Sequence, residues 1–529
     1  MSRKVIGLLT ASPESVYAQR MLEGVCARCH AYGYELAVFS SLVSVNFSQD
    51  KYLAGEMNIY QLINFDLLDG VIIDAISLTL SQGRDVIRQV TDLLEQKCKK
   101  PIVAVGASVK NYPYFMISDR PTFREIARHV MDVHGRKKVY FLTGPKGSPD
   151  SMDRVNGFKD VLEEKGLPFH EEHVFYGDFW YPSGNEMADR ILSGEVERPD
   201  AVICANDHMA ISLAKRLHEN GIRVPEDIVI TGFDATNEAA ISPISITTYS
   251  PDFSVATAEA VDALRREMDP GALILPCESQ AQQHMRAGMS CGCNHNLQEV
   301  IATLRESVYY LDHDFSSGKK PMDIGILLDS NMLEYLSDSG SPEECIHNIY
   351  SFSYLLGDYE EFYLCLDENW LNSDLCTKTG YPSKIRNVIH NTPELDSGHY
   401  QNGPLFHTRQ MLPDLGSESH APSAFYFMPV HFLDQPMGYA VLRHDLNKPH
   451  RLNCVVRNWL KNVSSGLEII RTEHKLETLS TRDGMTGVYN RRGMELLLDQ
   501  MLPKAKDNDQ VLAFVIDMDK LKYINDTFG

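Results

Sequence analysis

The chain has 529 residues, a hydrophobic fraction of 43% and a formal net charge of −22. This length predicts three or four domains, and an acidic chain without a dense Lys and Arg cluster argues against binding a nucleic-acid backbone. The amino-terminal residues lack the pattern of a signal peptide, and no run reaches the roughly 18 apolar residues of a membrane span. The cysteines are scattered along the sequence, which suits a reducing compartment. We therefore expect a cytoplasmic protein that binds neither DNA nor a membrane.

Short apolar runs alternate with amphipathic helix patterns in the first part of the chain. A helix is predicted at 17–32, and strands are predicted at 5–10, 35–40, 70–74, 101–105, 138–143, 201–204 and 228–232. Strands that alternate with helices form parallel sheets through right-handed crossovers. With this many units, we expect an α/β fold of two doubly wound lobes over residues 1–294, and not one very wide sheet.

Three motifs in this region carry a family resemblance. In chain order they are Arg154-Val-Asn-Gly157-Phe158, Asn206-Asp207-His-Met-Ala210 and Gly232-Phe-Asp234. They resemble the effector-binding core of the lactose-repressor family, which shares the fold of the periplasmic sugar-binding proteins. Members carry a helix-turn-helix before this core. Because the core begins at residue 4 here, we expect the DNA-reading part to be absent.

The resemblance implies a ligand cleft between the two lobes, at the carboxyl ends of the strands. It places five side chains there, with the 12–17 loop as a further wall: Asp119, Arg154, Phe179, Asn206 and Asp234. Carboxylates, an amide and a guanidinium bind hydroxyl groups, so the expected ligand is a small polar molecule such as a sugar. The alternatives are structural: helix caps for Asp119, Asn206 and Asp207, and core packing for Phe179 and Trp180.

Two cysteine pairs fall in the same region. Cys26 and Cys29 lie one turn apart on a predicted helix, and Cys291 and Cys293 come at the end of the region. Four thiols could form a zinc site. The sequence favours the alternative, in which Cys26 is a buried free thiol on an apolar helix face and the two pairs do not meet.

The middle of the chain has a different element order. Residues 295–320 predict a helical linker, and residues 321–450 contain two helical stretches, a strand at 361–366 and a hairpin of strands at 424–432 and 437–442. Helices, a strand, a hairpin and then a long helix are weakly similar to a GAF domain, which has an α+β fold. The resemblance rests on element order and assigns no pocket.

A long helix is predicted at 451–480, within a connector at 451–482. Five apolar residues keep an a/d-like spacing along it, namely Val456, Leu460, Val463, Leu467 and Ile470. This spacing predicts a dimeric coiled coil. The alternative is a single amphipathic helix that packs on its own domain.

The last region, 483–529, carries two motifs in a fixed order. The first is Asp483-Gly-Met-Thr486-Gly-Val-Tyr-Asn490-Arg-Arg, and the second runs from an apolar strand into Asp517-Met518-Asp519 and then Asn525-Asp526. Together they resemble the start of a GGDEF domain, the diguanylate cyclase family, with Leu521 where the family usually has Phe. The signature loop of the family is not among the 529 residues. We therefore expect the first part of an α/β catalytic domain, inactive by itself.

The resemblance also implies roles for individual residues. Asp517 is the expected catalytic metal ligand, the backbone carbonyl of Met518 a second ligand, and Asn525 the partner of the guanine edge of GTP. A carboxylate at the end of a buried strand suits Mg²⁺ (or Mn²⁺). The expected activity joins two GTP molecules into cyclic di-GMP in a homodimer under control of the sensor ligand. Two alternatives remain: a catalytically dead GGDEF module, and a ligand-sensing regulator that acts through a protein partner.

Overall fold

A computed structural model of the chain describes residues 3–13, 15–42, 50–80, 86–277, 285–293, 324–357, 359–392, 403–448, 452, 454–502, 514, 516 and 526–527. The chain divides into two units, Met1–Glu468 and Ile469–Gly529. Among the described residues, no helix combines the length and the apolar character that a membrane crossing needs. The linker predicted at 295–320 lies outside the described residues.

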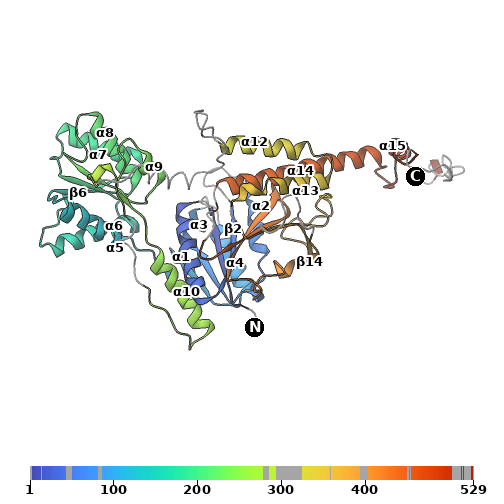
Figure 1. Cartoon of the computed structure of the whole chain (residues 1–529), viewed down its shortest axis with the longest axis horizontal. Coiled ribbons are helices and arrows are strands. Elements are labelled where there is room, and N and C mark those ends of the chain that lie inside the picture. Colours follow the sequence, from blue (N-terminus) through green and yellow to red (C-terminus); the bar gives the residue numbers. More distant parts are fainter. Residues whose placement is uncertain are drawn as a thin grey trace. The chain divides into compact units, whose positions relative to one another are not determined.

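The first lobe is a parallel sheet with the strand order β2-β1-β3-β4-β5, covered by helices on both faces (Figure 1). Its elements are β1 (Val5–Ala11), α1 (Val16–Tyr32), β2 (Glu35–Ser41), α2 (Asp50–Gln61), η1 (Phe65–Leu67), β3 (Gly70–Asp74), α3 (Ala75–Leu80), α4 (Val86–Lys97), β4 (Ile102–Val105), β5 (Tyr114–Phe115) and, later in the chain, α10 (Ser254–Met268). The strands predicted at 5–10, 35–40, 70–74 and 101–105 are confirmed.

Burial on both faces explains why the central residues of β1 to β4 are mostly apolar. Val71 of β3 belongs to the core that α2 and α4 cover. Its neighbour Gly70 points to the other face, where an added Cβ would lie 3.1 Å from Leu264 of α10. Local signals set the ends of α1: the Ser15 hydroxyl accepts a hydrogen bond from the N–H of Ala18, and Gly33 ends the helix at φ 67°.

The second lobe is a parallel sheet with the order β7-β6-β8-β9. The helices α5 and α6 lie on one face and α7 and α8 on the other (Figure 1). Its elements are α5 (Arg120–Arg128), η2 (His129–Val133), β6 (Val139–Thr143), α6 (Pro149–Glu164), η3 (Glu171–His173), β7 (Val174–Tyr176), α7 (Tyr181–Ser193), β8 (Ala201–Cys204), α8 (Asp207–Glu219), β9 (Val229–Thr231), α9 (Asn237–Ile241), β10 (Thr248–Tyr249), β11 (Met285–Arg286) and η5 (Met289–Cys291). The predicted two-lobed architecture is therefore present.

The middle region adds an antiparallel sheet with the order β14-β13-β12-β16-β15. Its elements are α12 (Ile324–Ser337), α13 (Pro342–Ser351), η7 (Ser353–Leu356), β12 (Glu361–Leu366), β13 (Lys384–Asn391), β14 (Leu405–His407), η8 (Thr408–Gln410), β15 (Ser423–Phe432) and β16 (Gln435–Asp445). The hairpin predicted from the sequence is β15 and β16. In addition, β15 pairs in parallel with β2 of the first lobe, so one ten-stranded sheet crosses the predicted boundary between the two regions.

The long helix is α14 (Cys454–Thr481). The five residues predicted as a dimer seam are each at most 3% exposed in the single chain. On the same helix, the ring of Trp459 meets Phe362 edge-on at 5.4 Å and its indole N–H donates to the carbonyl of Phe352. The seam residues are thus core residues of the single chain, which corrects the coiled-coil prediction for them. Leu476 and Leu479, further along, are 61% and 64% exposed.

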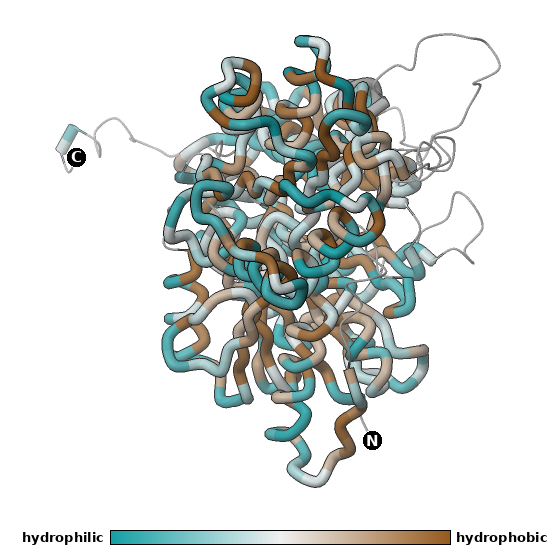
Figure 2. The backbone as a smooth tube through the Cα atoms, turned by 90° about the vertical axis from the view of Figure 1, so that its left-hand side faces the viewer, coloured by the Kyte–Doolittle hydropathy of each residue, from teal (hydrophilic) through white to brown (hydrophobic). Residues whose placement is uncertain are grey.

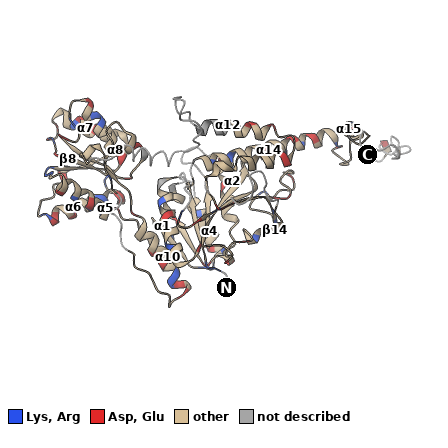
Figure 3. Cartoon of the chain, in the orientation of Figure 1, with Lys and Arg blue, Asp and Glu red and all other residues tan. Residues whose placement is uncertain are grey.

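Hydropathy and charge follow this layering. In Figure 2 the apolar stretches belong mainly to the interior strands, and hydrophilic residues are frequent on the outer turns. In Figure 3 the strands are almost free of charge, while Lys, Arg, Asp and Glu are mixed along the helices. Figure 3 shows no continuous stripe of Lys and Arg along the described residues.

Candidate functional site

The residues predicted to hold a ligand gather around Arg154 of α6, in the second lobe. The Arg154 side chain is 12% exposed, and its Nε and Nη2 atoms each lie 2.9 Å from Asp119 Oδ2. Its Nη1 donates to the backbone carbonyl of Ala205 at 2.8 Å. The guanidinium is therefore fixed by an ion pair at one edge and by a carbonyl at another.

Asp119 is free for this pair because another carboxylate caps α5. Asp153 Oδ2 accepts hydrogen bonds from the Ser118 hydroxyl at 3.0 Å and from the backbone N–H groups of Asp119 and Arg120 at 2.8 and 3.0 Å. The Asp119 side chain itself makes no capping hydrogen bond. The helix-cap alternative for Asp119 is thus wrong. The role of Asp153 was missed, although it adjoins Arg154 in the sequence.

Aromatic rings surround the guanidinium. Its central carbon lies 4.8 Å from the ring centre of Phe233, 5.3 Å from that of Phe179 and 5.8 Å from that of Phe123. Phe179 adopts φ 66°, a left-handed conformation that is costly for a bulky residue. Its ring occupies the space beside Gly144, where an added Cβ would lie 2.0 Å from a ring carbon. Phe179 therefore lies beside the guanidinium of Arg154 and also packs against the hydrophobic core of the second lobe, as the core-packing alternative expects.

Asn206 holds Phe179 in this position. Its Nδ2 donates to the carbonyl of Phe179 at 2.6 Å, and its Oδ1 accepts from the N–H of Met209 and so caps α8. Both ends of the amide are thus used within the protein. Asn206 belongs to the cluster, but its geometry fits the capping alternative and a positioning role for Phe179 better than the predicted ligand contact.

Asp234 contributes a second carboxylate beside Arg154. It adopts φ 100°, and its backbone N–H donates to the carbonyl of Tyr249 at 2.9 Å. Within the described residues, its carboxylate makes no hydrogen bond. Burial raises the pKa of Asp234 to about 7, the positive charge of Arg154 opposes this rise, and the carboxylates of Asp207 and Asp119 add to it. A carboxylate kept in this strained, desolvated position is typical of a binding site.

Tyr17 is the residue of the predicted 12–17 wall whose side chain bears on a ligand site. Its hydroxyl is buried and has no hydrogen-bond partner among the described residues. Burial raises the Tyr17 pKa above its usual range, with Asp74 and Asp150 adding to the effect. The ring packs edge-on against Phe253, with 5.1 Å between centroids. A buried hydroxyl without a partner is costly, so it marks a position where a ligand or water would be stabilised.

In the second unit, the first carboxy-terminal motif is a structural turn. Asp483 Oδ1 accepts from the hydroxyl and the N–H of Thr486, at 2.7 and 2.9 Å. Gly487 adopts φ 71°, which favours glycine, and Asn490 Oδ1 caps α15 (Arg491–Met501) through the N–H of Gly493. The motif thus fixes a turn before a helix. Asp517, Met518 and Asn525, the predicted catalytic and nucleotide residues, lie outside the described residues.

Two family models match the chain in the regions just described. That of the periplasmic binding protein-like domain matches residues 127–284. That of the diguanylate cyclase GGDEF domain matches residues 480–529. The chain contains a periplasmic-binding-protein-like domain and a GGDEF domain. The GGDEF match indicates a function of the diguanylate cyclase type, and the other match indicates a domain of the lactose-repressor type.

Relatives of the periplasmic-binding-protein-like domain are transcriptional repressors. The HTH-type transcriptional repressor PurR of Vibrio atlanticus is 26% identical over 250 residues, which cover 47% of this chain and 70% of the relative. PurR of Photorhabdus laumondii is 28% identical over 251 residues, 47% of this chain and 69% of the relative. A solved structure of a LacI-family sugar-binding regulator from Escherichia coli, complexed with phosphate, is 20% identical with a TM-score of 0.38, covering 55% of this chain and 99% of that one.

Proposed function

We propose that the protein is a ligand-regulated diguanylate cyclase, which converts two GTP molecules into cyclic di-GMP and two pyrophosphates. The observation that carries the proposal is the GGDEF match at 480–529, directly after the long helix α14. A sensor region precedes this helix in the chain. The order of sensor, helix and catalytic domain is the order that signal transfer along the chain requires.

The proposed sensor site comprises Arg154, Asp119, Asp234 and Phe179, with Tyr17 as a contribution from the first lobe. Two carboxylates and a guanidinium with spare N–H groups can bind the hydroxyls of a small polyol. The Phe179 ring can pack on the apolar face of a sugar ring. A ligand that contacts both lobes stabilises the closed arrangement, because only that arrangement supplies all contacts.

The middle region is the proposed relay, and a GAF-like fold for it stays part of the proposal. Support comes from the pairing of β15 with β2, which puts the middle strands and the first lobe into one sheet. The same region packs against the start of α14 through Phe362 and Trp459. A displacement of the first lobe would therefore act on the strands beneath the helix that leads to residue 480.

The proposed nucleotide site follows from the family resemblance. Asp517 and the carbonyl of Met518 would hold Mg²⁺ or Mn²⁺, which supplies positive charge next to the triphosphate when bound. Asn525 would orient the guanine base by hydrogen bonds. One GGDEF domain binds one GTP, so the product requires two chains. The exposed Leu476 and Leu479 of α14 are the residues that we assign to contact between two such chains.

The test is GTP turnover, measured as the cyclic di-GMP that the purified protein forms with Mg²⁺ or Mn²⁺. Asp517→Ala should lose nearly all activity, and Asn525→Ala should mainly raise the KM for GTP. Thr486→Ala is the control, because among the described residues the hydroxyl and N–H of Thr486 hydrogen-bond to Asp483 in the turn. Binding of GTP without turnover would support the catalytically dead module instead.

A further inference from the structure

The second cysteine pair meets two histidines, not the first cysteine pair. Cys26 and Cys29 are buried on α1 of the first lobe. Cys291 and Cys293 lie in the second lobe, together with His129 of η2 and His134, which directly follows η2. The four-thiol zinc site considered from the sequence is therefore wrong, because Cys26 and Cys29 do not meet the second pair. In the structure, His129 and His134 lie beside Cys291 and Cys293 instead.

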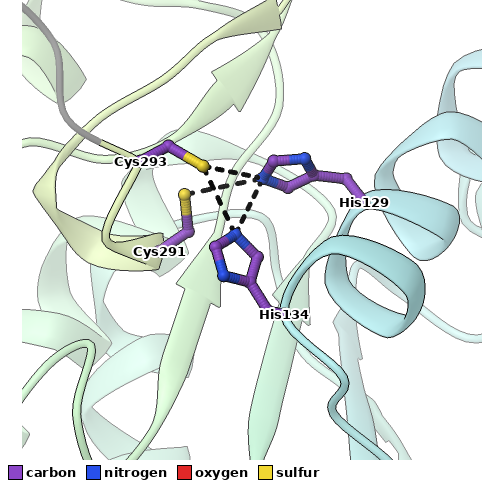
Figure 4. Close-up of side chains that lie close together, drawn as sticks. All are labelled: His129, His134, Cys291 and Cys293. Carbon is purple, nitrogen blue, oxygen red and sulfur yellow. Dashed lines mark hydrogen bonds between the residues drawn. The ribbon is translucent and has the colours of Figure 1, made fainter.

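Figure 4 shows the two thiols and the two imidazoles pointing toward a common centre. The Nε2 atoms of His129 and His134 are 3.1 Å apart, and Cys293 Sγ lies 3.7 and 3.5 Å from them. Cys291 Sγ lies 3.5 Å from His129 Nε2, and all four donor atoms are within 4.8 Å of one another. Zinc bonds of about 2.3 Å to sulfur and about 2.0–2.1 Å to nitrogen put tetrahedral donors roughly 3.3–3.8 Å apart. Four of the donor–donor distances, from 3.1 to 3.7 Å, are close to this range, and the widest separation, up to 4.8 Å, would contract when an ion binds.

Two local backbone features bring the donors together. The turn η2 is of the π type, and the N–H of His134 donates to the carbonyl of His129, five residues back. The wider turn puts the two imidazoles on the same side of the helix. After η5, Gly292 adopts φ 83° between the two cysteines. This left-handed glycine lets the chain reverse so that both thiols face the histidines.

The surroundings fit a bound cation as well. His129 is 9% exposed and Cys291 is 2% exposed, so two of the donors are shielded from water. The Thr247 hydroxyl lies 2.9 Å from Cys291 Sγ, where it can donate to a thiolate. Tyr249 packs edge-on to the ring of His129, at 6.3 Å. Metal ligands usually have such a supporting partner, and the shielding strengthens their attraction for a cation.

We propose that His129, His134, Cys291 and Cys293 form a tetrahedral binding site for a divalent metal of the zinc class. Two thiolates and two imidazoles are a ligand set that zinc prefers, and four protein ligands leave no open position, as in structural sites. The ion would tie the segment after β11 to η2, which is more than 150 residues earlier in the sequence.

The site also supports the proposed sensor cluster through one strand. Thr247 contacts Cys291, and two residues further on the carbonyl of Tyr249 accepts the N–H of Asp234. The carbonyl of Thr247 accepts the N–H of Gly232 in the same ladder. A metal that fixes the Cys291 loop would therefore hold the strand on which the strained Asp234 depends. This role rests on the geometry of the second lobe and is independent of catalytic activity.

The metal content of the purified 529-residue chain tests the proposal. We expect about one zinc ion per chain by mass spectrometry of the metals, and a melting temperature that falls when a strong chelator removes it. His134→Ala and Cys293→Ser should lose the ion. Cys277→Ser is the matched control, because Cys277 is an exposed thiol of the same region and should leave the metal content unchanged.

Cobalt binding to the unsubstituted chain gives a result that does not depend on the folding of variants. After chelator treatment, Co²⁺ should produce the thiolate charge-transfer band and the intense visible bands of tetrahedral coordination, and Zn²⁺ should abolish both. Chains that purify without metal and give no such spectrum would overturn the proposal. So would a metal content that is the same in His134→Ala, Cys293→Ser and the unsubstituted chain.

Discussion

The ring of Phe39 in β2 stacks on the ring of Phe427 in β15, with 4.9 Å between ring centres and 15° between ring planes. The two residues are also register partners in the parallel β2–β15 pair. Both are fully buried, in a core that contains residues from α2 and α4 as well as from β12 and β16. The first lobe and the middle region therefore share one core, and each shields apolar surface of the other.

Polar contacts reinforce this shared core. The N–H of Gly380 donates to Asn58 Oδ1 at 2.7 Å, and the N–H of Gly416 donates to Glu35 Oε2 at 2.7 Å. Glu35 also pairs with Arg3 at 2.8 Å. Separation of the two regions would leave these buried groups without partners. The two regions are thus expected to unfold together.

Alanine substitutions at the stacked pair test this coupling. Phe39→Ala and Phe427→Ala should each reduce the free energy of unfolding by about 3–5 kcal/mol, because each leaves a cavity in a closed core. The double variant should be less destabilised than the sum by about 0.5–1.5 kcal/mol, the usual coupling of an aromatic pair. Tyr354→Ala, at a 53% exposed position, is the control and should change stability by less than about 0.5 kcal/mol. Additive effects measured in urea would contradict a direct contact.

The Arg154–Asp119 ion pair predicts effects on both stability and ligand binding. Arg154→Met should destabilise the chain by about 3–5 kcal/mol, because it leaves the carboxylate of Asp119 buried without its partner. Asp119→Asn combined with Arg154→Met should recover part of this loss, while both variants should lose any thermal shift from a sugar. At a hundredfold excess over Kd that shift corresponds to about 2.7 kcal/mol in the unsubstituted chain. Arg120→Met, whose pair with Asp160 is exposed, should cost less than about 1 kcal/mol. A sugar-dependent shift that survives in the double variant would argue against this site.

Asp234 predicts a pH dependence of stability. Its folded-state pKa of about 7 lies above the unfolded value of about 3.9, so the folded chain favours the protonated form. The contribution of Asp234 to stability is full below pH of about 4 and is lost as the pH rises to about 7. Asp234→Asn removes this titration, so the variant should gain stability relative to the parent over this pH range, by an amount on the order of a few kcal/mol. Melting temperatures at several pH values measure the difference.

Asp160→Asn is the matched control for this experiment, and its expected effect on stability has the opposite sign. The neighbouring Arg120 lowers the pKa of Asp160. Asp160 therefore contributes stability above its unfolded pKa, and the asparagine variant should fall slightly below the parent as the pH rises. A parallel pH response of Asp234→Asn and the parent chain would show that Asp234 is not desolvated.

The two halves of α14 should respond differently to a charge. Val463→Asp should destabilise the chain itself, because Val463 is fully buried and an aspartate there would be an unpaired ion. Leu476→Asp should leave the free energy of unfolding within about 0.5 kcal/mol of the parent value and weaken self-association instead. Light scattering across a concentration series distinguishes the two effects. An unchanged association constant for Leu476→Asp would remove this half of α14 from the proposed dimer contact.

Local sequence patterns determined the elements and the domain types of this protein. The strands predicted at 70–74, 201–204 and 361–366 have the same bounds in the structure, because a buried strand needs an uninterrupted apolar run with polar residues at its ends. The motifs around Asp483 and Arg154 pointed to the two domains that the family models match. Both signals are short-range and stand in the sequence itself.

Only the tertiary structure decided which distant elements meet. A strand pattern shows that β15 is buried but not that β2 is its neighbour, since any apolar edge offers the same hydrogen bonds. The apolar stripe of α14 fits a partner helix as well as its own sheet, and packing selected the sheet. The sequence around His129 showed no pattern that indicates a metal site. It joined Cys291 and Cys293 only because the fold brings η2 against the loop after β11, a contact that no local spacing encodes.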